Sequence, residues 1–312
     1  MRLKLTELLQ IKYPILQGGM AWVSDARLAA AVSEAGGAGI IATGGRDVLW
    51  VKEQIRLAKQ LTNKPFGVNV QLQVPNKEEI VEAICEEQVA FVTLGAGNPI
   101  PFFPQFTAAG IKKIPVIPSV KLAKRVESSG ADAIVIEGME AGGHIGTLTT
   151  MALMTQVIPA VQIPVIAAGG FADGRGLAAA LIMGAAGIQM GTRFMVAEEC
   201  AVHDNCKQRL IAATDTDSVA TGILSGHAVR GVKNQFTERF LEMERKCASQ
   251  AELEKLATGT ARRAHVDGDV ENGMVQAGQS LLPLTKIEPV QSIIETIIAE
   301  AKERLTHAPV LI

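Results

Sequence analysis

Short apolar runs recur along the first two thirds of the chain, and each is followed by glycine or a polar residue. Eight runs start between residues 14 and 187, so a new run begins after about 25 residues, enough for one strand and one helix. Runs such as Pro164–Ala168 are apolar throughout, as parallel strands covered on both faces are. The predicted strands are Pro14–Gln17, Ala38–Ala42, Pro65–Val70, Ala90–Leu94, Ile114–Pro118, Ala133–Glu137, Pro164–Ala168 and Gly187–Met190.

Segments with helical periodicity separate these strands. Asp25 and Asp173 stand where they can cap helices, and Gly36, Gly130 and Gly184 stand where helices should end. The predicted helices are Ser24–Ala35, Val48–Leu61, Lys77–Glu87, Val120–Ser129, Thr149–Ile158 and Gly174–Met183. Eight such units favour an α/β fold, a (β/α)8 TIM barrel, over an open doubly wound sheet.

The repeat ends near Arg193, and charged helical segments such as Gln235–Lys246 and Gln250–Ala257 follow. We therefore predict three parts. Residues 1–195 form the barrel, and residues 196–285 form a small inserted helical subdomain near the C-terminus, beside the mouth of the barrel. Residues 286–312 contain a last helix, Glu288–Leu305, which packs back on the barrel.

Charge and composition exclude several classes of partner. The 312 residues include 30 basic and 32 acidic side chains, which leaves no overall field to attract nucleic acid or an anionic membrane. Only 9 Phe, 2 Trp and 1 Tyr are available for stacking on bases. The charged N-terminus does not resemble a secretory signal, and no apolar run is long enough to span a membrane. We expect a cytoplasmic protein.

Many of the 30 glycines follow the predicted strands, whose carboxyl ends meet on one face of a barrel. Glycine there lets a ligand approach the backbone, so a ligand site is predicted in preference to mere tight turns. Gly169, Gly170, Gly191 and Thr192 follow the last two strands, where backbone N–H groups of barrels often hold phosphate. The direction of the Arg193 side chain stays open. The clusters are Gly18–Gly19, Gly44–Gly45, Gly95 with Gly97, Gly138, Gly142–Gly143, Gly169–Gly170 and Gly191.

Other chemistries lack their usual signals. Residues 37–42 match a GxGxxA pattern but lead into a strand, so a Rossmann domain is not predicted. The group Cys200, His203 and Cys206 lacks the second ligand pair of a structural zinc site, and no metal is predicted. No predicted strand has an interior lysine, which argues against a Schiff-base aldolase.

One histidine, His144, lies just after the sixth strand in a glycine-rich segment, residues 137–146. Imidazole titrates near neutrality, so His144 is the candidate catalytic residue; a surface-loop histidine is the alternative. Asn69 and Gln71 could bind a planar heterocycle or merely cap the end of a strand. A phosphate site, glycine-rich walls and one histidine fit a barrel that binds flavin mononucleotide (FMN).

Five motifs resemble the superfamily of nitronate monooxygenases (2-nitropropane dioxygenases) and flavin-dependent enoyl-acyl carrier protein reductases. The resemblance covers nearly the whole chain. Residues 137–150 and 273–280 are most similar to the enoyl reductase branch, the FabK type. The motifs are Pro14–Met20, Gly67–Val70, Glu140–Gly146, Ala167–Phe171 and Gln189–Arg193.

The resemblance implies a role for each site residue. Gly169, Gly170, Gly191 and Thr192 would hold the FMN phosphate. Other cofactor-binding residues would line or support the isoalloxazine, and His144 would act beside its N5 edge, as an orienting group or as a proton donor in competition with solvent. These further residues are Gly19, Met20, Asn69, Gly142, Gly143, Gln189 and Met190.

The resemblance also implies the reaction. NADH or NADPH would reduce the flavin, and an acyl carrier protein would deliver a trans-2-enoyl chain in bacterial type II fatty acid synthesis. A homodimer and activation by a monovalent cation are further expectations. The acidic carrier needs a basic patch, for which Arg230 and Lys233 are candidates, although each could equally belong to a solvated turn.

Two other functions compete. A nitronate monooxygenase would use the same barrel, FMN and histidine, with the histidine as a base and oxygen as the oxidant. A barrel that binds FMN or a metabolite as a sensor or scaffold is the other, and the retention of His144 in its glycine-rich loop argues against it.

Overall fold

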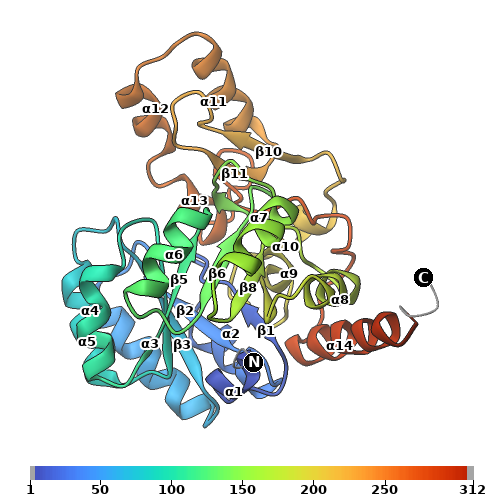
Figure 1. Cartoon of the computed structure of the whole chain (residues 1–312). Coiled ribbons are helices and arrows are strands. Elements are labelled where there is room, and N and C mark those ends of the chain that lie inside the picture. The colour runs from blue at the N-terminus through green and yellow to red at the C-terminus, as the bar shows by residue number, and fades with distance from the viewer. Residues whose placement is uncertain (1–3, 308–312) are drawn as a thin grey trace.

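The computed structural model describes residues 4–307 and confirms the (β/α)8 barrel (Figure 1). Its eight parallel strands are ordered β1-β9-β8-β6-β5-β4-β3-β2, and a bridge between Leu16 and Ala38 joins the first strand to the last. The bounds are β1 Ile15–Gln17, β2 Gly39–Ala42, β3 Phe66–Gln71, β4 Phe91–Gly95, β5 Lys112–Ile117, β6 Ile134–Glu137, β8 Val165–Ala168 and β9 Gly187–Met190.

The helices form the outer layer of the barrel. Asp25 and Asp173 accept hydrogen bonds from Leu28 N–H and Gly176 N–H, so both cap helices as predicted. Gly36, Gly130 and Gly184 have positive φ directly after helices, which confirms them as helix ends. The bounds are α2 Ala26–Glu34, α3 Val48–Leu61, α4 Lys77–Glu87, η1 Ile100–Phe102, α5 Phe103–Ala108, α6 Val120–Ser128, α7 Thr150–Val157, η2 Ile158–Ala160, α8 Gly174–Ile182 and α9 Thr192–Met195.

The barrel has two apolar layers, one inside the sheet and one between the sheet and the helices. Phe91 fills the inner layer, and a Cβ on Gly67 would lie 2.4 Å from its ring, so a side chain at position 67 would clash. The helix α1 (Leu5–Leu9), which the sequence did not predict, contributes Leu5 and Leu9 to the same inner layer.

The strand β5 begins earlier than predicted and contains Lys113, so the expectation of no lysine within a strand is wrong. The Lys113 Nζ donates to Thr107 Oγ1 at 3.1 Å and pairs with Asp132 at 2.9 Å. Lys113 belongs to the amino-terminal half of the strand, away from the carboxyl-end mouth. The argument against a Schiff base at the mouth therefore stands.

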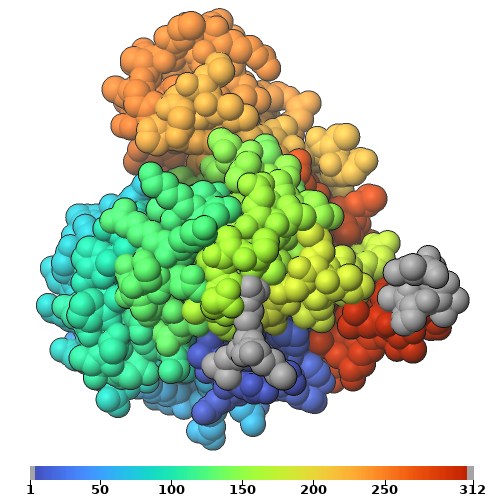
Figure 2. All heavy atoms as spheres, viewed as in Figure 1, coloured from blue at the N-terminus to red at the C-terminus, as the bar shows by residue number. Residues whose placement is uncertain are grey.

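The segment beyond residue 200 is not purely helical, which corrects that part of the prediction. A small antiparallel sheet joins β10 (Ser218–Thr221) and β11 (Val229–Val232) to β7 (Gly143–His144), which leaves the barrel rim after β6. The helices of this segment are α10 Asp204–Ile211, α11 Gln235–Arg245, α12 Gln250–Ala257 and α13 Thr260–His265. Figures 1 and 2 show β10, α11 and α12 above the barrel, whereas Figure 1 shows α10 beside α8 and α9.

The subdomain has a small core of its own, made by Phe236, Phe240, Leu253 and Met274. The last helix, α14 (Val290–His307), packs against α8 and α2 of the barrel. These features support the proposed division at residues 195 and 285, which stays a proposal. Among residues 4–307, no helix combines the length and apolar character of a membrane span.

Candidate active site

A cavity of about 640 Å³ opens at the carboxyl ends of the barrel strands, which is within the usual size range of ligand pockets. Loops after seven of the eight barrel strands contribute to it, together with α13 and residues 276–280. His144 and every residue predicted to bind the cofactor line this one cavity: Gly19, Met20, Asn69, Gly142, Gly143, Gly169, Gly170, Gln189, Met190, Gly191 and Thr192.

A buried polar network shapes the loop after β1. Gln17 Nε2 donates to Gly18 O and to Ser24 Oγ, the latter at 2.8 Å, while Gln17 Oε1 accepts from Ile40 N–H at 3.0 Å. Ser24 Oγ in turn accepts from Met20 N–H at 2.9 Å. Both ends of the loop are therefore fixed from below, which holds its backbone against the cavity.

Gly19 in this loop lies against Asn69 at the end of β3. A Cβ on Gly19 would lie 2.2 Å from the Asn69 Cβ, so only glycine allows this approach. Asn69 Nδ2 donates to Thr93 Oγ1 at 3.0 Å. The amide plane of Asn69 is thus oriented by β4, as a side chain that faces a flat ligand requires.

The loop after β8 carries two glycines with positive φ, Gly169 at 95° and Gly170 at 83°. Thr150 Oγ1 donates to Gly169 O at 2.9 Å, and Glu140 accepts from Thr150 N–H at 2.9 Å. The Glu140 carboxylate thus connects the loop after β6 to the start of α7, and Thr150 connects α7 to the glycine loop. Gly169 and Gly170 are held in the conformation that exposes successive N–H groups.

Residues 276–280 close the other side of this region. Gly278 N–H donates to Thr192 Oγ1 at 2.9 Å, and Gln279 N–H donates to Glu140 O at 2.9 Å. Arg193 next to Thr192 is buried and pairs with Glu288, which answers the open question of its direction: its charge is already neutralised. Backbone N–H groups are therefore the donors left for the predicted phosphate.

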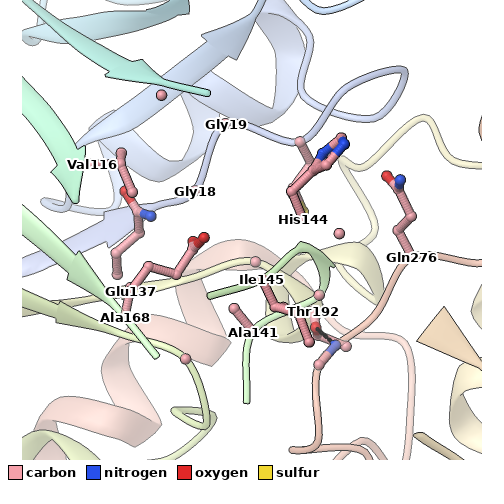
Figure 3. Close-up of a pocket in the computed structure, with 18 of the residues that line it drawn as sticks. Gly18, Gly19, Val116, Glu137, Ala141, His144, Ile145, Ala168, Thr192 and Gln276 are labelled. Atoms are coloured by element: carbon pink, nitrogen blue, oxygen red, sulfur yellow. Dashed lines mark hydrogen bonds between the residues drawn. The ribbon is translucent and has the colours of Figure 1, made fainter. Parts of the chain in front are cut away.

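His144 reaches the cavity from the small sheet of the subdomain. Residues Gly143 and His144 pair with Arg230 and Val229 of β11, and Figure 3 shows the imidazole facing Gln276 across the mouth. His144 is exposed, but surrounding protein atoms desolvate its imidazole in part, and this desolvation together with the charge of His227 lowers its pKa below the ordinary value. The imidazole is therefore mainly neutral at pH 7.

Glu137, at the end of β6, is a residue that sequence reasoning quoted but gave no role. Its carboxyl group points into the cavity (Figure 3), and no hydrogen bond to it is found among residues 4–307. Burial raises the pKa of Glu137 to about 7. A carboxyl group that gains or loses its proton near neutrality, within a ligand cavity, is a candidate functional group.

The Glu137→Gln variant should remove a pH dependence of stability. Between the ordinary pKa and about 7, the folded protein retains a proton that the unfolded chain has released, so wild-type stability falls as pH rises through this window. Without FMN, we expect the variant to melt about 2–4 °C above wild type at pH 8 and equally at pH 5. Thermal melts of both proteins at each pH give the difference; a constant difference contradicts the assignment.

Two buried polar atoms beside the cavity lack hydrogen-bond partners among the described residues: Gln189 Oε1 and His265 Nδ1. His265 Nε2 accepts from Gln276 N–H at 3.3 Å, and burial lowers the pKa of His265 to about 4. His265 therefore stays neutral and connects α13 to the segment that faces His144. Gln189 Oε1 is an acceptor available to an N–H group of a ligand.

The two candidates for a basic patch, Arg230 and Lys233, differ in their exposure to solvent. Arg230 is buried and donates to Met139 O at 2.9 Å, so it connects the subdomain to the loop after β6 and offers no surface charge. Lys233 is exposed.

In the suggested zinc group, Cys206 Sγ donates to Ala264 O at 3.0 Å and His203 Nδ1 accepts from Asn205 N–H. Residues 4–307 contain no group of three or more potential His, Cys, Asp or Glu metal ligands.

Several lining residues escaped sequence reasoning: Trp22, Glu140, Ala261, His265 and Gln276. Two signals for them were available. The segments 137–150 and 273–280, which include Glu140 and Gln276, were recognised as similar to the enoyl reductase branch. The others lie in a loop or in the subdomain, where no periodicity indicates which side chain faces a cavity.

Comparison with known proteins connects this geometry to a family. A sequence profile described as nitronate monooxygenase matches residues 2–89 and 74–300. A probable nitronate monooxygenase of Staphylococcus aureus is 33% identical, with 97% of this chain and 98% of that protein covered.

Two further relatives carry other names. An octahydro-1H-indene-4-carboxyl-CoA dehydrogenase of Rhodococcus jostii is 40% identical, but the match covers 72% of this chain and 64% of that protein. The structure of FabK from Thermotoga maritima superposes with a TM-score of 0.96 at 46% identity, over 98% of both chains.

Proposed function

The chain belongs to the nitronate monooxygenase family, and from this premise we propose that it is an FMN-dependent enoyl-acyl carrier protein reductase. It would reduce trans-2-enoyl thioesters with NADH or NADPH. The observation that carries the proposal is the similarity to FabK from Thermotoga maritima, at 46% identity over 98% of both chains. The homodimer, the monovalent cation and the role in fatty acid synthesis stay predictions of the same resemblance.

The residues present fit FMN. Gly19 and Asn69 line the cavity in close contact, because Gly19 has no Cβ to clash with the Asn69 side chain. Gln189 Oε1 is a buried acceptor without a partner, suited to a ring N–H group, and the positive-φ pair Gly169–Gly170 suits a phosphate. We therefore propose that Gly169, Gly170, Gly191 and Thr192 hold the phosphate. The other proposed contacts to FMN are Gly19, Met20, Asn69, Gly142, Gly143, Gln189 and Met190.

Bound FMN would supply the hydride chemistry between the reduced nicotinamide and the enoyl thioester. In this proposal the protein orients the reactants and manages the proton. His144 orients the thioester or gives a proton to its α-carbon, in competition with solvent, and Gln276 faces it from the opposite wall. His265 holds the backbone of Gln276, and α13 covers the cavity and limits the access of water.

The proposed function predicts a two-step cycle. Under anaerobic conditions, NADH or NADPH should bleach the yellow FMN-loaded protein, and crotonyl thioester should restore the colour. Absorbance near the flavin maximum measures both steps, and butyryl thioester is the matched control, since it has no double bond to reduce. If the bleached protein stays colourless after crotonyl thioester is added, the enoyl reductase proposal fails.

Nitronate oxidation is the second candidate, and the match of the nitronate monooxygenase profile to residues 2–89 and 74–300 is the observation that favours it. His144, whose lowered pKa favours the neutral imidazole, would then act as the base. Failure of either reduced nicotinamide to bleach the protein, with oxygen uptake on a nitroalkane, would select this function. Both candidates leave the barrel and the placement of FMN unchanged.

The pH dependence separates the two uses of His144. Its lowered pKa means that the imidazolium form grows only as pH falls below the ordinary histidine range. If the imidazolium donates the proton, recovery of colour with crotonyl thioester speeds up from pH 7.5 to pH 5.5. If the neutral imidazole is a base, the rate of nitroalkane oxidation rises with pH and reaches a plateau above the pKa of His144. Stopped-flow rates across this range decide, with His144→Gln as the control that should lack the dependence.

A further inference from the structure

The guanidinium group of Arg46, in the loop after β2, is held between two indole rings. It lies over Trp22 and Trp50, 4.4 Å and 4.3 Å from the ring centroids. The Arg46 backbone is fixed as well, because its N–H donates to Thr43 O at 3.0 Å and its carbonyl accepts from Asn76 Nδ2 at 3.1 Å. The orientation of the guanidinium group is therefore preorganised.

The backbone of Trp22 has a strained conformation where its indole contacts Arg46. Its φ of 68° is in the left-handed region, which is strained for a residue other than glycine. Its indole covers Gly45, where a Cβ would lie 2.4 Å from the ring. Strain and close packing at the rim of a ligand cavity indicate that the position of this indole matters.

The charge of Arg46 has no direct counterion. The buried Nε has no hydrogen-bond partner, and residues 4–307 provide no ion pair to the group. The charges of Asp25 and Asp47 act on Arg46 from a distance and offset burial only in part. Their carboxylates cap helices instead of binding the guanidinium: Asp25 accepts from Leu28 N–H at 3.0 Å and Asp47 from Trp50 N–H at 2.8 Å.

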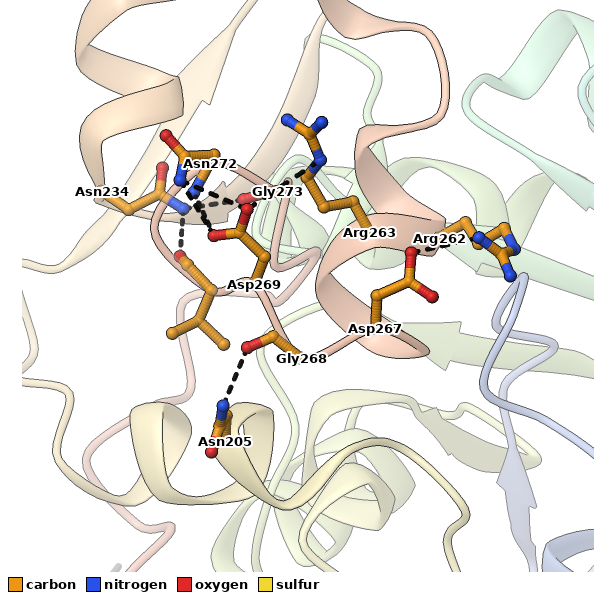
Figure 4. Close-up of polar contacts among 10 residues, drawn as sticks. Asn205, Asn234, Arg262, Arg263, Asp267, Gly268, Asp269, Asn272 and Gly273 are labelled. Atoms are coloured by element: carbon orange, nitrogen blue, oxygen red, sulfur yellow. Dashed lines mark hydrogen bonds and ion pairs between the residues drawn. The ribbon is translucent and has the colours of Figure 1, made fainter.

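A second cation, Arg262 of α13, acts on this group electrostatically. Burial and then the positive charge of Arg262 lower the pKa of Arg46, so the two guanidinium groups repel one another. Arg262 pairs with Asp267 at 3.1 Å, but that pair is half exposed and neutralises it only in part. Figure 4 shows Arg262 beside a loop from the N-terminal part of the chain. Two cations kept close at a cavity rim are typical of an anion site.

This group lies beside the cavity and is separate from the glycine loops: Arg46 and Arg262 do not line the cavity, but residues next to them in the chain do. Trp22, Gly44 and Gly45 line the cavity, as do Ala261 and His265 of the helix that carries Arg262. Trp22 and Arg46 lie in the loops after β1 and β2, whereas the proposed FMN phosphate site follows β8 and β9. An anion bound at Arg46 would therefore be distinct from the FMN phosphate. It would belong to another molecule that enters the cavity past α13.

We propose that Arg46, with Arg262 and the face of Trp22, binds a phosphate group of a reactant that enters the cavity. The inference rests on the proposed function, in which both reactants carry such a group: the pyrophosphate of the nicotinamide dinucleotide, or the phosphate of the pantetheine arm of the thioester. The planar guanidinium of arginine binds phosphate through two parallel hydrogen bonds. The adjacent indole offers a stacking surface to the rest of the ligand.

Tryptophan fluorescence tests the site directly, because the chain has only 2 Trp and both contact Arg46. The FMN-loaded protein is titrated with ADP-ribose and, separately, with 4′-phosphopantetheine. Adenosine and pantetheine are the matched probes without phosphate. We expect a saturable change with at least one phosphate-bearing probe and none with its matched probe. The responding probe identifies the reactant.

Three variants complete the test. Arg46→Gln should weaken binding of the responding probe by about tenfold or more, and Arg262→Gln, which leaves the indole contacts intact, by about threefold. Arg304→Gln, an exposed arginine of α14, is the control and should bind as wild type does. No saturable change with either probe, or equal affinity in Arg46→Gln, overturns the proposal.

Binding needs no turnover, so this result is independent of the reaction. If crotonyl thioester fails to restore the colour while a phosphate probe still binds, the enoyl reductase proposal is wrong and the phosphate site stands. If the reductase cycle runs and neither probe binds, the phosphate site is wrong and the proposed function stands.

Discussion

Replacement of His144 by alanine is expected to slow enoyl thioester reduction by about 100- to 10,000-fold while FMN stays bound. The imidazole faces the cavity from β7, whose backbone is held by pairing with Val229 and Arg230 of β11. Removal of the side chain leaves that pairing intact, so the loop and the proposed contacts of Gly142 and Gly143 to FMN remain. Anaerobic stopped-flow absorbance measures the two half-reactions separately, and the loss should fall on recovery of colour with crotonyl thioester.

The neighbouring His227→Ala variant is the matched control. His227 contributes to the lowered pKa of His144 through its charge and has no other proposed role at the cavity. Its removal should raise the pKa of His144 and shift the pH profile upward, with the maximal rate within about threefold of wild type. Full activity of His144→Ala, or an equal loss in both variants, would contradict the catalytic role of His144.

The barrel could be predicted because its strands are locally distinct. Runs such as Pro164–Ala168 are apolar throughout and are separated by helical segments of regular length, so periodicity alone orders the eight units. The glycine clusters then follow from topology, since all parallel strands of a barrel end on the same face. For this reason even distant residues such as Gly19 and Thr192 were expected, and found, around one cavity.

The parts that were missed depend on contacts between distant segments. The strand β7 has only two residues, Gly143 and His144, and exists because β11 pairs with it from the subdomain. The raised pKa of Glu137 comes from its burial in the cavity, and the direction of Arg193 from its pairing with Glu288, far along the chain. Local propensity carries no information on such contacts.

Gly169→Ala should have the second large effect, a loss of FMN binding of about 100-fold or more. The φ of Gly169 is 95°, which an L-residue rarely adopts, and a Cβ there would lie 2.9 Å from both Gly138 O and Thr150 Oγ1. Since Thr150 Oγ1 donates to Gly169 O, the clash falls on the contact that holds the loop. The loop must shift, and its N–H groups then no longer point where we propose the phosphate to bind. The ratio of flavin to protein absorbance after gel filtration measures retention.

The control for backbone strain is Gly130→Ala. Gly130 has the same φ of 95° at the end of α6, but a Cβ there would meet no atom within 4 Å. Both variants should therefore lose about 1–2 kcal/mol of stability from strain, while only Gly169→Ala should lose FMN. If both variants retain FMN as wild type does, the loop after β8 does not hold the phosphate. If both variants lose FMN equally, the loss follows from lower stability of the whole protein, because Gly130 lies outside the cavity lining.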